Sequence, residues 1–142
     1  MIKNTYLAMV LCFCFVISLR AADSSDLDKM QGKWETKKTT DDGDKVTVRL
    51  EINKDKLVFK ILDASGDVKF YGVAKLKADR VGVFNVLKVT EIKGGESESD
   101  LSPIEDHTTI YQLRSGKMVL ASNFEKEREE APALDVYEKV SR

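Results

Sequence analysis

The chain has 142 residues, with 23 Lys and Arg against 24 Asp and Glu and a formal net charge of −1. This length supports a single domain, and charges of both signs are interspersed along it. The balance argues against nucleic acid as a partner, because proteins that bind nucleic acids concentrate positive charge on one face or stretch.

The N-terminal segment is typical of a secretory signal peptide. Lys3 precedes an apolar run from Tyr6 to Leu19, and Ala21-Ala22 follows. The run is too short to favour a membrane span. We therefore expect a signal peptide over residues 1–22 and a secreted or periplasmic domain over residues 23–142, without stable membrane insertion after cleavage. A retained N-terminal anchor is the alternative.

Both cysteines of the chain, Cys12 and Cys14, fall inside this apolar run. After cleavage the domain would have no disulfide and no thiol nucleophile. Roughly 120 residues are still enough to bury one hydrophobic core.

The rest of the sequence shows a helix-capable stretch, Asp23–Lys29, and then a pattern of β-strands and turns. The clearest alternation of apolar and polar residues runs from Val46 to Ile52. Strands are predicted over residues 33–39, 46–52, 57–62, 68–77, 81–90, 108–114, 117–122 and 134–140. Between them we expect short turns, such as Ala78-Asp79, and one long polar loop over residues 93–100. A charged helical turn is expected over Phe124–Glu130.

About eight strands joined by short turns must pair antiparallel, because a parallel pair needs a crossover of a dozen or more residues. Such a meander either closes on itself or packs as a sandwich, and closure removes exposed strand edges. We expect an all-β, monomeric protein, an eight-stranded antiparallel up-and-down barrel with a short N-terminal helical turn.

The stretch that joins the helical turn to the first strand is distinctive. Gly32 suits a chain that turns sharply as a helix ends, and Trp34 is the only tryptophan. Gly32-Lys33-Trp34, with Leu27 before it and Asp42-Gly43 after it, resembles the Gly-x-Trp signature of lipocalins, in particular the lipocalin-like (calycin-type) domain of secreted bacterial proteins.

The resemblance implies two features of the barrel. The helical turn would close one end, with Leu27 and Met30 on its inner face. Trp34 would pack beneath a basic side chain from near the end of the last strand, Arg142 or Lys139. Arg142 is favoured, because a guanidinium stacks well on an indole.

No pattern in the sequence points to an enzyme, a metal or a cofactor. The only histidine, His107, follows Asp106 and is interpreted as a surface loop residue, and no serine lies in a nucleophile-elbow context. One histidine without a cysteine in the mature domain argues against a zinc site. Asp63–Asp67 begins like a calcium loop, but Val68 occupies the position where such a loop needs glycine, so we expect a hairpin turn.

The barrel interior is the candidate site. One face carries apolar side chains that would line a pocket, with space from two small residues and a polar group from an amide: Val48, Leu50, Phe59, Phe70 and Leu87, then Gly72 and Ala74, then Asn85. The alternative is that these side chains fill one another's gaps. The predicted function is binding of a small apolar or amphipathic ligand. A protein-interaction or inhibitor module with a filled barrel is the alternative, and it predicts an exposed apolar patch around Tyr71, Phe84 or Val86.

Overall fold

The computed structural model describes residues 24–124 and 131–141. The predicted signal peptide, the helical turn expected before Pro132 (from residue 125 on) and Arg142 lie outside these ranges. One helix and nine strands are present in the described ranges: α1 Ser24–Met30, β1 Gly32–Thr39, β2 Lys45–Asn53, β3 Lys56–Leu62, β4 Val68–Val81, β5 Phe84–Gly95, β6 Ser102–Pro103, β7 His107–Arg114, β8 Lys117–Ser122 and β9 Ala133–Lys139.

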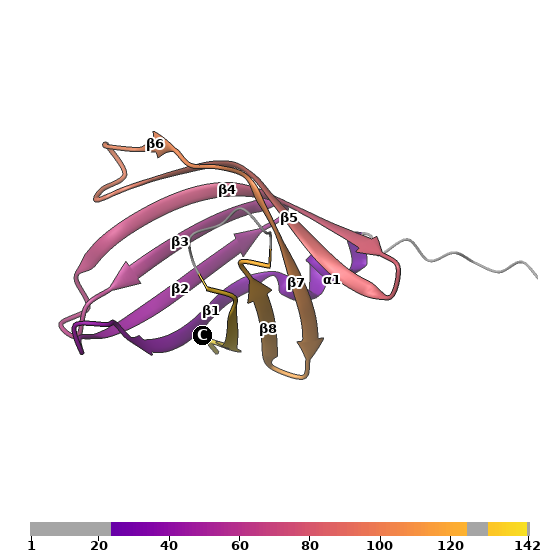
Figure 1. The fold of residues 1–142 in the computed structure, drawn as a ribbon, viewed down its shortest axis with the longest axis horizontal. Helices are drawn as coiled ribbons and strands as arrows, with labels where there is room; N and C mark the ends of the chain where they lie inside the picture. The colour runs from indigo at the N-terminus through magenta and orange to yellow at the C-terminus, as the bar shows by residue number, and fades with distance from the viewer. Residues whose placement is uncertain (1–23, 125–130, 142) are drawn as a thin grey trace, which may run out of the picture.

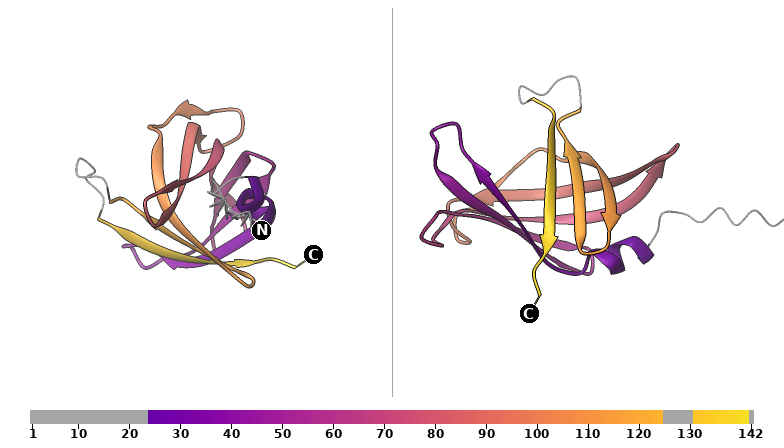
Figure 2. Two further views of the ribbon diagram at one scale, coloured as in Figure 1. Left: turned by 90° about the vertical axis from the view of Figure 1, so that its right-hand side faces the viewer. Right: turned by 90° about the horizontal axis from the view of Figure 1, so that it is seen from below.

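Eight of the strands form a closed antiparallel barrel, as predicted (Figure 1). Each strand pairs with its neighbour in the chain from β1 to β5 and then through β7, β8 and β9, and β9 pairs with β1 to close the ring. The short β6 pairs with the far end of β5, where Pro103 is tolerated because an edge position requires no ladder donor. Figure 2 shows the ring of strands from two further sides.

The eight barrel strands follow the predicted ones except at the β4–β5 hairpin, and the short β6 was not predicted. The predicted turn at Ala78-Asp79 is wrong, because both residues pair with β5 in the ladder. The chain turns instead at Gly82-Val83, where Gly82 has a φ of 59°. Two-residue hairpin turns need such positive φ values, and glycine adopts them without strain. At its other end β5 continues to Gly95, so the polar loop is shorter than predicted.

The helix α1 closes one end of the barrel. Its last residue, Met30, is fully buried, and Leu27 packs against the core. Trp34 is 2% exposed, and its indole Nε1 donates a hydrogen bond to the Met30 carbonyl oxygen at 2.7 Å. Gly32 lies between them with a φ of 111°, a conformation that is strained for any residue with a side chain.

The cation that covers Trp34 is Lys139. Its Nζ lies 5.3 Å from the centroid of the indole ring. The two residues face each other across the β1–β9 ladder, and this register places the lysine that ends β9 over the ring. Arg142, which the sequence favoured for this position, lies outside the described residues.

Two polar side chains fasten α1 to the strands. Gln31 bonds to the β2–β3 turn through both ends of its amide: Nε2 donates to the Lys54 carbonyl oxygen at 3.0 Å, and Oε1 accepts from the Lys54 N–H at 2.6 Å. The Tyr111 hydroxyl donates to Asp26 Oδ2 at 2.8 Å. Hydrogen bonds from Lys29 and from Tyr111 lower the pKa of Asp26 against the opposing effect of burial. These hydrogen bonds therefore hold α1 in place across the end of the barrel.

The core lies inside the barrel and under α1. The largest fully buried side chains are Met30 and Met118, and the core cluster draws on α1 and on all eight barrel strands: Met30, Trp34, Leu50, Ile52, Leu57, Ala74, Leu76, Ala78, Leu87, Val89, Ile92, Tyr111, Met118 and Tyr137. The chain from Asp23 onward thus contains a closed barrel with its own core. No helix in the described ranges has the length and apolar character needed to cross a bilayer.

Candidate ligand-binding site

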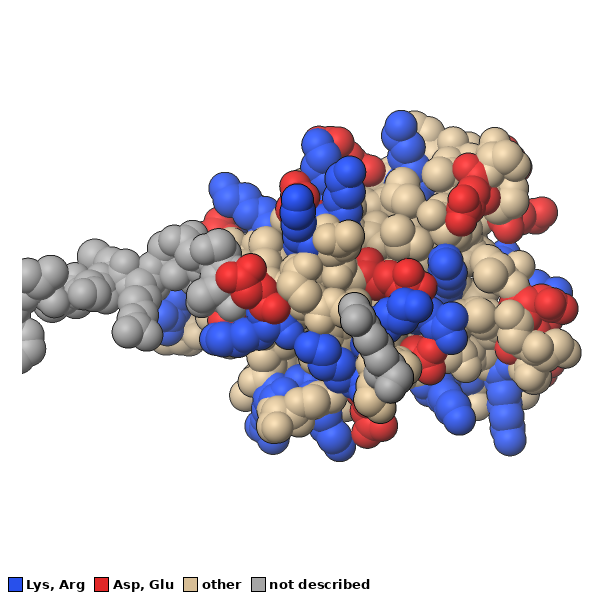
Figure 3. Space-filling model, turned by 180° about the vertical axis from the view of Figure 1, so that it is seen from behind, with Lys and Arg blue, Asp and Glu red and all other residues tan. Residues whose placement is uncertain are grey.

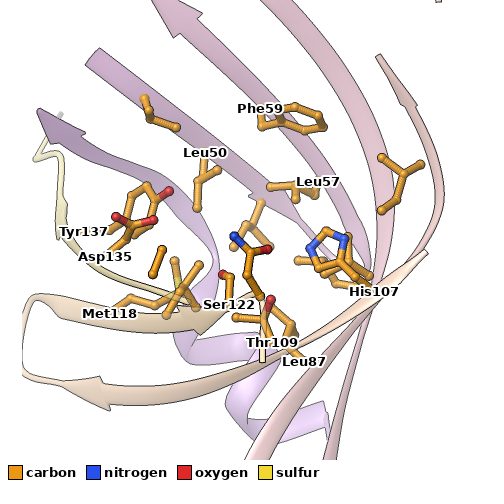
Figure 4. A pocket seen from close by; sticks show the side chains of 18 of the residues that line it. Leu50, Leu57, Phe59, Leu87, His107, Thr109, Met118, Ser122, Asp135 and Tyr137 are labelled. Carbon is orange, nitrogen blue, oxygen red and sulfur yellow. The ribbon is translucent and has the colours of Figure 1, made fainter. Parts of the chain in front are cut away.

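A cavity of about 450 Å³ occupies the barrel interior on the side away from α1 (Figure 4). All eight barrel strands contribute side chains to it. Its walls on β2 to β5 are apolar throughout: Val48, Leu50, Ile52, Leu57, Phe59, Phe70, Leu76, Leu87, Val89 and Ile92. Sites for small molecules commonly enclose about 300–1,000 Å³ behind mostly apolar walls, so the cavity has the size and lining of such a site.

The structure brings five of the six predicted ligand-binding residues together around this cavity: Val48, Leu50, Phe59, Phe70 and Leu87. Asn85 is not among them. It pairs with Arg80 close to the β4–β5 turn and lines a separate depression at the end closed by α1. As the alternation predicts, Asn85 and Leu87 lie on the same face of β5. Asn85, however, lies closer to the β4–β5 turn and beyond the end of the cavity.

The aromatic wall of the cavity is built over glycines. Phe59 pairs with Gly72 across β3 and β4, and its ring occupies the space that a Cβ at Gly72 would need. Phe70 covers Gly94 in the same way, and the centroids of the two rings are 5.6 Å apart. An aromatic ring that covers a strand glycine compensates for its missing side chain. The space left by Gly72 is therefore filled by Phe59 and is not open to a ligand.

This arrangement predicts that Gly72→Ala destabilises the protein by about 1–3 kcal/mol, the usual cost of overpacking. A strand glycine without such a neighbour would instead gain stability from alanine. Chemical denaturation of Gly72→Ala in the native background and in a Phe59→Ala background measures the difference. We expect the cost to disappear when the ring is absent, and an equal cost in both backgrounds would contradict the arrangement.

A salt bridge crosses the seam between the first and last strands at the open end of the barrel. In the described part of the chain, β1 and β9 share two register pairs, both near α1. Farther toward the open end, the Lys38 ammonium donates to Asp135 Oδ2 at 2.7 Å. Both residues line the cavity. The salt bridge thus joins β1 and β9 beyond their last backbone pair. It also places two opposite charges, which compensate each other, at the mouth of the cavity.

Three further polar side chains reach the cavity from β7 and β9. Thr109 is 3% exposed, and Tyr137 is buried, which raises the pKa of its phenol and keeps it protonated. The interpretation of His107 as a surface loop residue is wrong. It is the first residue of β7, pairs with Val89, is partly buried and lines the cavity. With Ser122 and Asn123 at the end of β8 and the Lys38–Asp135 pair, these groups make the wall on β7 to β9 and β1 partly polar, whereas the wall on β2 to β5 is apolar (Figure 4).

Sequence reasoning missed the wall contributed by β9. There the polar-looking positions Asp135 and Tyr137 face the cavity, whereas Leu134 and Val136 are 69% and 43% exposed. The register explains the inversion, because Tyr137 pairs with the fully buried Met118 of β8. Apolar character alone favours the wrong face of this strand, and only the pairing with β8 identifies the inner one.

Within residues 24–124 and 131–141, no group of three or more His, Cys, Asp or Glu side chains is placed to hold a metal ion. Comparisons of the chain with family models, with curated proteins and with solved structures find no match. The assignment of the site therefore rests on its geometry.

Proposed function

We propose that this protein is an exported, lipocalin-like barrel that binds one small apolar or amphipathic molecule in its interior. The observation that carries the proposal is the cavity of about 450 Å³, apolar on β2 to β5 and polar at its mouth. Transfer of an apolar group from water into such a chamber is favourable in proportion to the area buried. The signal-peptide pattern supports export, and the arrangement of Gly32, Trp34 and Lys139 supports the lipocalin-like assignment.

The polar edge of the cavity narrows the chemistry of the ligand. Lys38 and Asp135 form a salt bridge with each other, so a charged ligand would have to break this pair to bind either side chain. Thr109 and the neutral phenol of Tyr137 offer uncharged hydrogen-bonding groups nearby. We therefore expect an apolar body with an uncharged polar group, such as a hydroxyl or an amide.

The proposal is tested by thermal unfolding of the chain from Asp23 to Arg142 against a panel of fatty alcohols, fatty acids, retinoids and haem. A ligand that binds the native state alone stabilises it by about 2.7 kcal/mol at a free concentration one hundred times its Kd. We expect the melting temperature to rise with the concentration of a fatty alcohol or retinol. A flat response across the panel would contradict ligand binding.

An outward row of apolar side chains supports a second candidate, a protein-interaction or inhibitor module. Leu134 and Val136 are exposed on the outer face of β9 and pair with Ala121 and Val119 of β8. Of the three residues around which the sequence predicted such a patch, Val86 is buried at 5% exposure, Tyr71 is partly buried and Phe84 is 55% exposed. A flat ligand panel together with a protein partner that is lost in Leu134→Ser would favour this candidate.

A further inference from the structure

The β4–β5 hairpin ends in an exposed apolar tip, Val81-Gly82-Val83-Phe84. Val81 is 59% exposed, Val83 79% and Phe84 55%. The hairpin projects past α1 at the closed end of the barrel (right-hand side of Figure 1). Hairpin turns are normally occupied by polar residues or glycine, and a contiguous exposed apolar group marks a site of contact with a protein or a membrane.

Basic side chains lie at this end of the molecule. Arg80 precedes the tip directly, and Arg114 lines the same depression as Asn85, the residue that follows the tip. Farther from the tip, Lys117 pairs with Glu138 and Lys54 lies in the β2–β3 turn next to α1. In Figure 3 the end that carries α1 lies at the left, and Lys and Arg predominate there. An apolar tip with cations set back from it is complementary to a bilayer surface, where anionic headgroups lie above the acyl chains.

The described chain begins with α1, whose first residue is Ser24. In Figure 1, α1 and the tip lie at the same end of the barrel. The described chain therefore begins at the end from which the tip projects.

We propose that the tip docks reversibly on the surface of a lipid bilayer that contains anionic headgroups. Val83 and Phe84 enter the boundary between headgroups and acyl chains, and Arg80 and its basic neighbours contact the headgroups. The mouth of the cavity, at the opposite end, then faces the water. This docking is independent of what the barrel binds.

The test is flotation of the chain from Asp23 to Arg142, which contains the closed barrel, with vesicles of phosphatidylcholine alone and of phosphatidylcholine mixed with phosphatidylglycerol. The variant is Val83→Ser with Phe84→Ser. The matched control is Leu134→Ser with Phe124→Ser, which removes an aliphatic and an aromatic side chain of similar exposure, 69% and 58%, away from the tip. Circular dichroism verifies that each variant is folded.

We expect binding to the anionic vesicles that falls with added salt. The tip variant should bind at least about tenfold more weakly, because it loses the burial of two apolar side chains, and the control should bind as the native protein does. The proposal is overturned if neither vesicle binds the native protein or if both variants lose binding equally. It is also overturned if size-exclusion chromatography shows a dimer that the tip variant abolishes, since the tip would then contact a second copy of the chain.

Discussion

Trp34→Ala is expected to lower the free energy of unfolding by about 3–5 kcal/mol, the range for removing a large buried aromatic side chain. The indole is 2% exposed and joins α1 to the barrel through its hydrogen bond to Met30. Its removal leaves a cavity under the helix and leaves the Met30 carbonyl oxygen without that donor. Because this is the only tryptophan, unfolding should be followed by circular dichroism.

A conservative variant separates packing from hydrogen bonding at this position. Trp34→Phe retains most of the apolar surface and removes the N–H donor, so we expect a smaller loss than for alanine, with about 1–3 kcal/mol of it from the unsatisfied carbonyl. A change in stability of less than about 1 kcal/mol for Trp34→Ala, the value typical of an average substitution, would contradict the packing of Trp34 between α1 and the barrel.

Val48→Trp is expected to abolish ligand-induced stabilisation while the barrel stays folded. Val48 is partly buried and lines the cavity. The indole would enter empty space of about 450 Å³, so it avoids most of the overpacking cost of a filled core. The thermal-unfolding panel measures the effect, with the melting temperature of the unliganded variant as the check on folding.

The matched control for this experiment is Val58→Trp on the neighbouring strand. Val58 pairs with Glu51 and Val73 and alternates with the inward Leu57 and Phe59, so it faces outward. We expect it to leave the ligand response intact. A full response in Val48→Trp would place the ligand outside the barrel and contradict the proposed site.

The sequence predicts the barrel well where one face of a strand is buried and the other is wet. From Val46 to Ile52 the alternation is regular, and the observed β2 extends the predicted strand by one residue at each end. The prediction fails at the β4–β5 hairpin, because Ala78-Asp79 resembles a turn in composition but lies within the ladder. The true turn, Gly82-Val83, is apolar and exposed. That exception to ordinary turn chemistry is the feature on which the membrane proposal rests.

The site is predictable only in part for a related reason. Alternation on β2 to β5 identifies the apolar wall, because those strands have one dominant apolar face. On β9 both faces carry apolar residues, and the inner one is set by pairing with β8, which a single sequence does not specify. The amount of empty space likewise depends on how Phe59 and Phe70 lie over their glycines, a matter of rotamer and register rather than of composition.

Native mass spectrometry of the protein purified from its own host examines the barrel as a carrier without a prior choice of ligand. We predict a species heavier than the polypeptide by the mass of one small molecule, which is released on denaturation and is absent from Val48→Trp purified in the same way. A bare polypeptide mass under native conditions, from a protein that is folded and monomeric, would contradict ligand binding in the barrel and direct attention to the outer face of β8 and β9.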